Sequence, residues 1–143
     1  MTNFKRIEKH YQLSDEEFEQ QFQNCLLSPV LFTHEAHLRL AFIHILKYGE
    51  SIAIKNITSQ LKNYVIFAGE KGKYHETITV VSIKEIALRM NSSHQKDFRI
   101  FIQEFPELLN NFKSIINNRY SFDVFQSNEA RRHYLKPDKL PYK

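Results

Sequence analysis

The sequence predicts an all-α protein, a single-domain helical bundle of five to seven helices. Two observations favour this class: glycine is scarce, and apolar residues recur at helical spacing. The chain has 143 residues but only 3 glycines, whereas roughly ten would be expected at about 7% usage. Because glycine is the residue best suited to positive φ, this shortage disfavours a protein of many β-hairpins and a glycine-rich nucleotide site. We therefore expect no nucleotide or flavin cofactor.

A first helix is predicted to begin at Ser14. The run Ser14-Asp15-Glu16-Glu17 has the pattern of a capping box, in which serine and the third residue after it satisfy free amides. Apolar residues then recur every fourth position, at Phe18, Phe22 and Leu26. Ser28-Pro29 is expected to end this helix.

The next two helices are separated by Gly49. Thr33 is a suitable N-cap for a helix over about 34–48, and Gly49 is a suitable stop. This segment is apolar almost all round, with only Arg39 and Lys47 clearly charged after its first turn, so we expect it to be central and buried. A third helix is expected from Glu50 to near Gly69.

A fourth helix is predicted from about Tyr74 to Met90. The run 77–81 favours a strand locally, but apolar residues continue at helical spacing beyond it. Shorter helices are expected around 98–105, 108–116 and 127–134. The whole chain, 1–143, then forms one domain, with residues 1–13 and 137–143 peripheral or frayed.

Charge and composition restrict the classes of partner. The formal net charge is +4, and the basic residues are scattered rather than gathered into one face, so nucleic acid is disfavoured as a partner. No apolar run approaches the roughly 18 residues of a membrane span, and no signal peptide is visible at the N-terminus. The single cysteine, Cys25, cannot form an internal disulfide, which is typical of a cytoplasmic protein.

Three histidines suggest a site. His34 and His37 lie three residues apart, so they share one face of the second helix. His75 opens the fourth segment, and packing of the two helices would bring it toward that pair. Imidazoles from two helices, with Glu35, Glu76 or water completing the shell, suit a divalent metal such as Zn²⁺, Fe²⁺ or Ni²⁺. We predict His34, His37 and His75 as metal ligands or acid/base groups, and Tyr74 and Arg131 as residues that orient the substrate.

A structural interpretation of these residues remains open. His34, His37 and His75 could instead be hydrogen-bonded histidines of the core or its rim, because a pair of histidines at this spacing is a weak signal. We expect His44, two turns further along the helix, to be a core histidine with a backbone partner. His10, His94 and His133 are assigned no role, since they lie in polar or less regular stretches.

Two functions are therefore carried forward from the sequence. The first is a small cytoplasmic protein with a histidine-lined polar pocket, acting on a small polar molecule as a metal-dependent or histidine acid/base enzyme. The alternative is a non-catalytic binding or scaffold protein, in the form of a homodimer, whose interface is made of exposed Phe or Tyr.

Several motifs resemble a small group of bacterial all-helical proteins for which no activity is established. They are the segments 32–41 and 73–79, Tyr120-Ser121, 127–131 and Pro137-Asp138. The resemblance implies that one pattern includes His34, His37, Tyr74, His75, Thr77, Thr79, Tyr120, Ser127 and Arg131. The three histidines are also distantly similar to those of DinB-type metal-binding four-helix bundles, whose histidine spacing differs.

Overall fold

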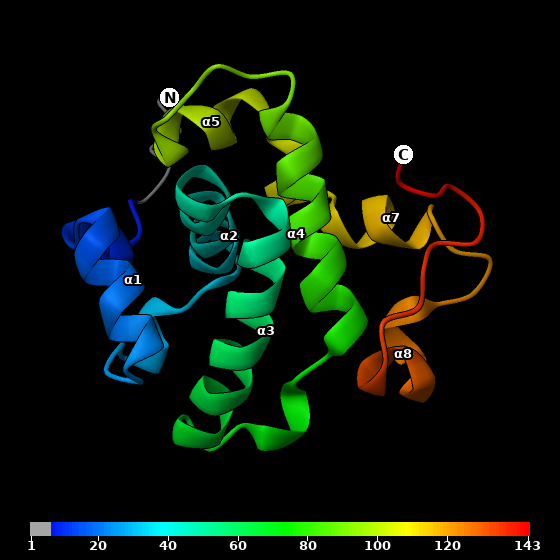
Figure 1. Ribbon diagram of the computed structural model, residues 1–143, viewed down its shortest axis with the longest axis horizontal. Helices are drawn as coiled ribbons and strands as arrows, with labels where there is room; N and C mark the ends of the chain where they lie inside the picture. Colours follow the sequence, from blue (N-terminus) through cyan, green and yellow to red (C-terminus); the bar gives the residue numbers. More distant parts are fainter. Residues whose placement is uncertain (1–6) are drawn as a thin grey trace, which may run out of the picture.

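Three long helices form the centre of the protein in the computed structural model, which describes residues 7–143 (Figure 1). They are α2 (His34–Tyr48), α3 (Glu50–Phe67) and α4 (Glu76–Met90), and each packs against the other two. The Thr33 hydroxyl accepts a hydrogen bond from the Ala36 amide and caps α2. Gly49 has a φ of 89°, which glycine adopts without strain and which lets the chain reverse directly into α3.

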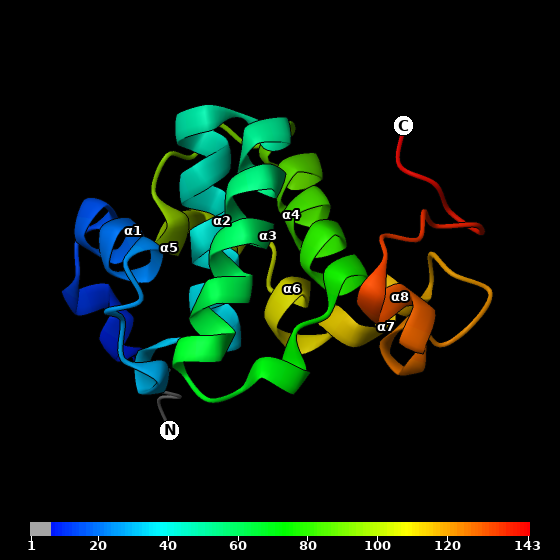
Figure 2. The ribbon, with the colours of Figure 1, turned by 60° about the horizontal axis from the view of Figure 1, so that its bottom comes forward.

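The shorter elements lie on both sides of this centre. Before α2 come a 3₁₀ turn (Lys9–Gln12), α1 (Asp15–Gln23) and a second 3₁₀ turn (Pro29–Leu31). After a 3₁₀ turn (Lys71–Lys73) and α4 come α5 (Phe98–Glu104), α6 (Glu107–Asn110), α7 (Phe112–Asn117), a 3₁₀ turn (Val124–Gln126) and α8 (Asn128–Arg132). In both ribbon views α1 lies to one side of α2 and α3, whereas α7 and α8 lie on the far side of α4 (Figures 1 and 2).

The predicted fold class is confirmed. The described part of the chain contains eight α-helices and no strand, and five of the helices have at least seven residues. The β propensity of residues 77–81 is overridden because this run is buried in α4. The hydroxyls of Thr77 and Thr79 each donate a hydrogen bond to a backbone carbonyl oxygen.

Helix α4 belongs to both apolar clusters of the core. The larger cluster joins α1, α2, α3, α5 and α4, which contributes Ile83 and Ile86. The smaller one is built by Val81 of α4 together with Ile116, Tyr120, Val124 and Ala130 of the C-terminal segment. Because α4 presents apolar residues to both clusters, the residues after α7 pack against the same helix as the central bundle.

Several predicted boundaries are wrong. The first helix ends at Gln23 rather than at Ser28-Pro29, because the backbone of Cys25 turns into the left-handed region with a φ of 56°. As a result, Leu26 is 70% exposed instead of continuing the apolar face. The fourth helix begins at Glu76, two residues after Tyr74, because His75 is its N-cap. The last helix ends at Arg132, short of Tyr134.

The two ends of the described chain are held against the bundle rather than frayed. In the N-terminal segment, His10 is fully buried. Residues 137–143 have no regular structure, but Pro137 is buried and the ring of Tyr142 lies 4.0 Å from the guanidinium of Arg119. The part of the N-terminal expectation that concerns residues 1–6 lies outside the described residues.

A buried carboxylate holds the C-terminal segment. Glu85 of α4 is 1% exposed, and it accepts hydrogen bonds from Arg89 (2.8 Å), from Arg119 (2.5 Å) and from the Tyr142 hydroxyl. Two cationic partners and a hydroxyl compensate the desolvation of one buried charge. The network therefore joins α4 to the residues after α7 and to the end of the chain.

Another buried polar residue has no such compensation. His44 of α2 is fully buried, and neither of its ring nitrogens has a hydrogen-bond partner among the described residues. Its burial is as expected from the sequence, but the expected backbone partner is missing. The ring packs against Tyr48 at 5.4 Å between centroids, and burial lowers the pKa of His44.

We predict that Glu85→Ala will lower the free energy of unfolding by about 3 kcal/mol or more, because it leaves two guanidinium groups without their buried anion. Urea unfolding followed by circular dichroism measures the change. The matched control is Glu16→Ala at an exposed position of α1, for which a change below about 0.5 kcal/mol is expected. Equal effects of the two substitutions would contradict the anchoring role.

We predict that His44→Leu will leave the free energy of unfolding unchanged or raise it by about 1–3 kcal/mol, because an unsatisfied buried polar group is replaced by an apolar one. Thermal unfolding checks this. The same change at His10, which is equally buried but hydrogen-bonded, should lower the stability by about 1–3 kcal/mol. A clear loss at His44 would show that its ring has a partner after all.

Candidate metal centre

A buried arginine fixes the N-terminal segment to the central bundle. Arg39 of α2 is 4% exposed, and its guanidinium donates to the carbonyl oxygens of His10 (2.8 Å) and Leu13 (2.9 Å). It also donates to the carboxylate of Asp15 at 2.8 Å. Since a buried guanidinium is costly unless it is paired and hydrogen-bonded, these contacts hold the turn Lys9–Gln12 in one position.

This anchoring also orients the ring of His10. The Nδ1 atom lies 3.3 Å from a guanidinium nitrogen of Arg39, and the Nε2 atom lies 2.8 Å from a carboxylate oxygen of Glu8. Because a guanidinium only donates, Nδ1 is the acceptor and Nε2 carries the proton. Burial lowers the pKa of His10, although Glu8 opposes this shift, so the ring is neutral at neutral pH.

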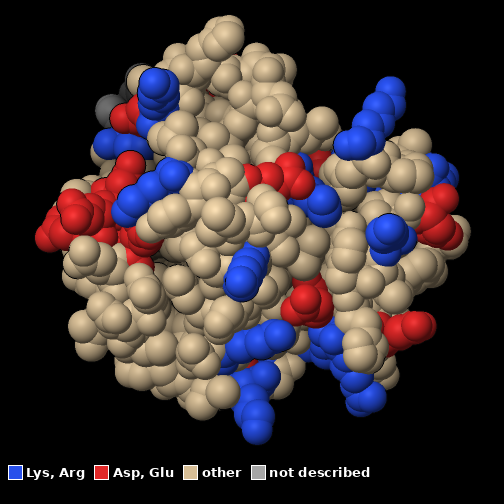
Figure 3. All heavy atoms as spheres, in the orientation of Figure 1, with Lys and Arg blue, Asp and Glu red and all other residues tan. Residues whose placement is uncertain are grey.

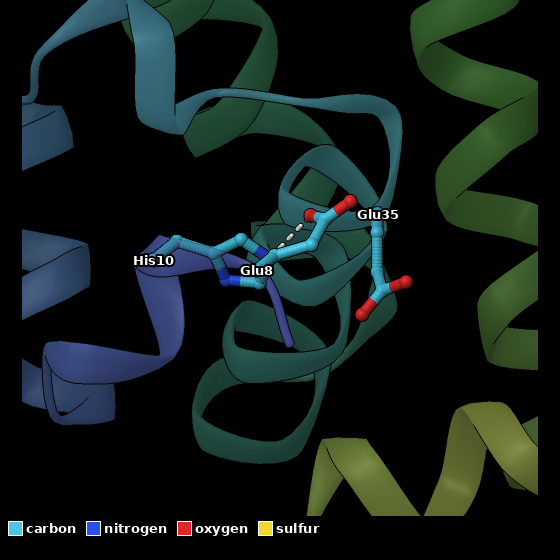
Figure 4. A group of neighbouring side chains, drawn as sticks. All are labelled: Glu8, His10 and Glu35. Carbon is cyan, nitrogen blue, oxygen red and sulfur yellow. Dashed lines mark hydrogen bonds and ion pairs between the residues drawn. The ribbon is translucent and has the colours of Figure 1, made fainter. Parts of the chain in front are cut away.

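Two carboxylates complete a group of three with His10. Glu8 also accepts from the Thr33 hydroxyl at 2.5 Å, and Glu35 accepts from the Tyr11 hydroxyl at 2.7 Å. One ligand atom from each of Glu8, His10 and Glu35 lies within 4.8 Å of the other two. Figure 4 shows Glu8 between the other two side chains, with Glu35 extending from the first turn of α2. In residues 7–143, no other three His, Cys, Asp or Glu residues gather in this way.

The group borders a surface pocket of about 110 Å³. The N-terminal turn and α2 contribute Glu8, Tyr11 and Glu35 to its lining, and α5 contributes Arg99, Ile102 and Gln103. Two guanidinium groups lie over the ring of Tyr11, that of Arg39 at 5.2 Å and that of Arg99 at 4.9 Å from its centroid. The carboxylates are therefore open to small molecules, whereas the histidine lies behind them.

The donor set suits a divalent metal. One imidazole and two carboxylates are ligands that Zn²⁺, Fe²⁺ and Mn²⁺ accept. Ligation by Nε2 of His10 requires its proton to move to Nδ1, which then faces Arg39. At 3.3 Å this is among the longest contacts of Arg39, so it can lengthen while the 2.8–2.9 Å bonds to the backbone and to Asp15 remain.

The structure places His34 and His37 on one face of α2, as the sequence predicts, but gives them separate surroundings. The exposed His34 donates from Nε2 to the Leu108 carbonyl at 2.9 Å and packs against Phe112. The ring of His37 lies 5.3 Å from that of Phe32. Burial, with a contribution from His34, lowers the pKa of His37 from 6.5 to about 4.

His75 has a different task from the one expected. Its Nδ1 accepts from the Ile78 amide at 3.1 Å, which caps α4, and its Nε2 donates to the Val124 carbonyl at 3.1 Å. Both ring nitrogens are thus engaged. The packing of α2 against α4 is confirmed, but His34, His37 and His75 do not gather into the shared ligand set predicted from the sequence.

The other two predicted site residues, Tyr74 and Arg131, make hydrogen bonds to other residues of the chain. The Tyr74 hydroxyl donates to Glu76 at 2.6 Å, and burial raises the pKa of Tyr74. Arg131 donates to the Gly72 carbonyl at 2.8 Å and joins α8 to the turn before α4. The catalytic roles of Tyr74, Arg131 and the three histidines stay predictions.

Glu8 and His10 are not expected as metal ligands from the sequence, and Glu35 is expected only to complete the shell of the three histidines. His10 was assigned no role because its stretch of sequence is polar and lacks regular spacing. The signal that could have found the group is Arg39: a charged residue in an otherwise apolar helix requires polar partners from another segment. That signal does not reveal which segment supplies them, because the partners are mostly backbone carbonyls.

Charged residues are unevenly distributed over the visible surface. On the face shown in Figure 3, Asp and Glu gather over α1, whereas Lys and Arg lie in several places, among them a group at the lower edge. The first turn of α1 carries three acidic residues, Asp15, Glu16 and Glu17.

The comparisons with known proteins do not identify a family, since no protein-family model, curated protein or solved structure matches the chain. The resemblance to a bacterial group therefore stays a prediction. Among the described residues, no helix has the length and apolarity required to cross a membrane.

We predict that the stability of the protein falls as the pH is lowered from about 6.5 to about 4, partly because of His37. The unfolded chain binds a proton near pH 6.5, whereas folded His37 does so only near pH 4. The unfolded state is therefore favoured across this window, and the loss is constant below it. Urea unfolding at several pH values should show a shallower dependence in His37→Phe. The exposed control His94→Phe should keep the full slope.

Proposed function

We propose that this protein binds a divalent metal ion through Glu8, His10 and Glu35 and uses it on a small polar molecule in the adjoining pocket. The observation that carries the proposal is the convergence of a buried imidazole nitrogen and two carboxylates at the edge of a pocket. It replaces His34, His37 and His75 as the expected ligand set, because both nitrogens of His75 already have partners.

The surroundings of the three residues support ligation. Metal-binding side chains are commonly held by hydrogen bonds from a further set of residues, which fix their orientation. Thr33 does this for Glu8 and Tyr11 does it for Glu35. The Tyr11 hydroxyl remains protonated, because burial and the neighbouring Glu35 raise its pKa. Arg39 holds the backbone on which His10 stands.

Three protein ligands leave room for water or substrate on the metal. In such sites the metal acts as a Lewis acid, polarising a bound oxygen or lowering the pKa of a bound water toward neutrality. A proton released from such a bound water would pass most readily to a carboxylate oxygen of Glu8 or Glu35 that does not bind the metal. The reaction class this supports is metal-assisted attack on a small polar substrate.

We predict that the protein binds Mn²⁺ or Zn²⁺ with one-to-one stoichiometry and that Glu35→Gln weakens the affinity at least about tenfold, since the substitution removes an anionic ligand. Isothermal titration calorimetry on protein purified without an affinity tag and stripped of metal measures both values. Glu35 is only partly buried, and the substitution keeps its shape, so the fold should persist.

Two further variants complete this experiment. His10→Ala should weaken binding by a similar factor, whereas His94→Ala, at an exposed histidine of the same chain, should bind as the wild type does. Circular dichroism shows whether each variant is folded. Wild-type protein that binds neither cation, or that loses affinity equally in the His94 variant, contradicts the proposed site.

A further inference from the structure

Arg99 lines the same pocket that the candidate metal centre borders. It is exposed in the first turn of α5, and within residues 7–143 its guanidinium makes no hydrogen bond or ion pair. Its described contact is the face of the Tyr11 ring, 4.9 Å from the centroid. The same tyrosine donates its hydroxyl to Glu35 at 2.7 Å. Tyr11 therefore contacts both the Arg99 guanidinium and the candidate ligand Glu35 at this pocket.

We propose that Arg99 and the bound metal together hold a small oxyanion, a carboxylate or a phosphate, in this pocket. The inference rests on the proposed function and specifies its substrate class. A guanidinium presents paired N–H groups that match the two oxygens of such an anion, and the metal accepts a further oxygen. Gln103 supplies an amide and Ile102 an apolar wall, within a pocket of about 110 Å³ that suits only a few heavy atoms.

The charges around the pocket make this binding dependent on the metal. An anion that enters the pocket without a bound cation meets the carboxylates of Glu8 and Glu35, which repel it. A bound divalent metal makes the local charge more positive, so that the metal and Arg99 attract the same anion. An anion that bound equally well without metal would therefore occupy some other place.

The experiment follows the nuclear relaxation of two anions, inorganic phosphate by ³¹P and acetate by ¹H, in the presence of Mn²⁺. The protein is kept in excess over Mn²⁺, so that little free cation remains. Enhanced relaxation that saturates with anion concentration shows an anion beside the bound metal. Saturation by phosphate alone, or by acetate alone, assigns the oxyanion to that class, and either supports the proposal.

Arg99→Gln should weaken anion binding about tenfold or more, the usual scale for loss of a charge-assisted hydrogen-bond pair, while its Mn²⁺ affinity stays unchanged. The matched control Arg132→Gln, at an exposed arginine of α8, should bind anion and metal as the wild type does. A parallel calorimetric titration of phosphate and acetate into metal-free protein should show no binding.

Failure of the oxyanion site and failure of the metal centre give different results. Protein that binds Mn²⁺ but neither anion overturns the oxyanion site and leaves the metal centre standing. The oxyanion site is also overturned if Arg99→Gln keeps full anion affinity, or if metal-free protein binds the anion as tightly. Absence of Mn²⁺ binding by the wild type overturns the metal centre, and it also overturns the oxyanion site because that site requires the metal.

Discussion

The buried charge of Arg39 is the constraint on which the candidate site depends. A guanidinium that α2 carries into the interior must find acceptors, because an unpaired buried charge costs several kcal/mol. The acceptors are the carbonyls of His10 and Leu13 and the carboxylate of Asp15. All three belong to the N-terminal segment, so compensating one charge positions that segment. The position brings Glu8 and His10 beside Glu35, at the start of the helix that carries Arg39.

On the other side of the bundle, the buried charge that needs partners is negative. Glu85 of α4 is a buried anion, and its partners Arg119 and Tyr142 lie in the C-terminal segment. Each of two packed helices thus carries one buried charge that a segment distant in sequence neutralises. The Thr77 hydroxyl donates to the His133 carbonyl and accepts from the Leu135 amide, and both bonds add to the second attachment. These polar contacts specify the position of the two outer segments, in addition to their apolar packing against the bundle.

Local signals explain what the sequence could predict. The limits of α2 follow from Thr33 and Gly49, and the start of α1 follows from the Ser14 capping box, because each signal acts within four residues. The end of α1 was not predictable in this way, since the left-handed turn falls on Cys25, a residue without preference for it. The N-cap role of His75 was not predictable for a related reason. A histidine before a helix can be a ligand or an N-cap, and for His75 only the position of Val124 decides between them.

If the proposed metal binds, Arg39 also links its site to the attachment of the N-terminal segment. In the metal-free tautomer, Nδ1 of His10 accepts from Arg39, whereas a ring that binds metal through Nε2 carries its proton on Nδ1 and cannot accept. Ligation therefore exchanges one weak contact of Arg39 for bonds between the metal and residues on both the segment and α2. Because Glu35 belongs to α2 and the other two ligands precede α1, the metal becomes a second connection between the same two parts. Its binding free energy then adds to the stability of the docked segment, since the undocked chain lacks the complete ligand set.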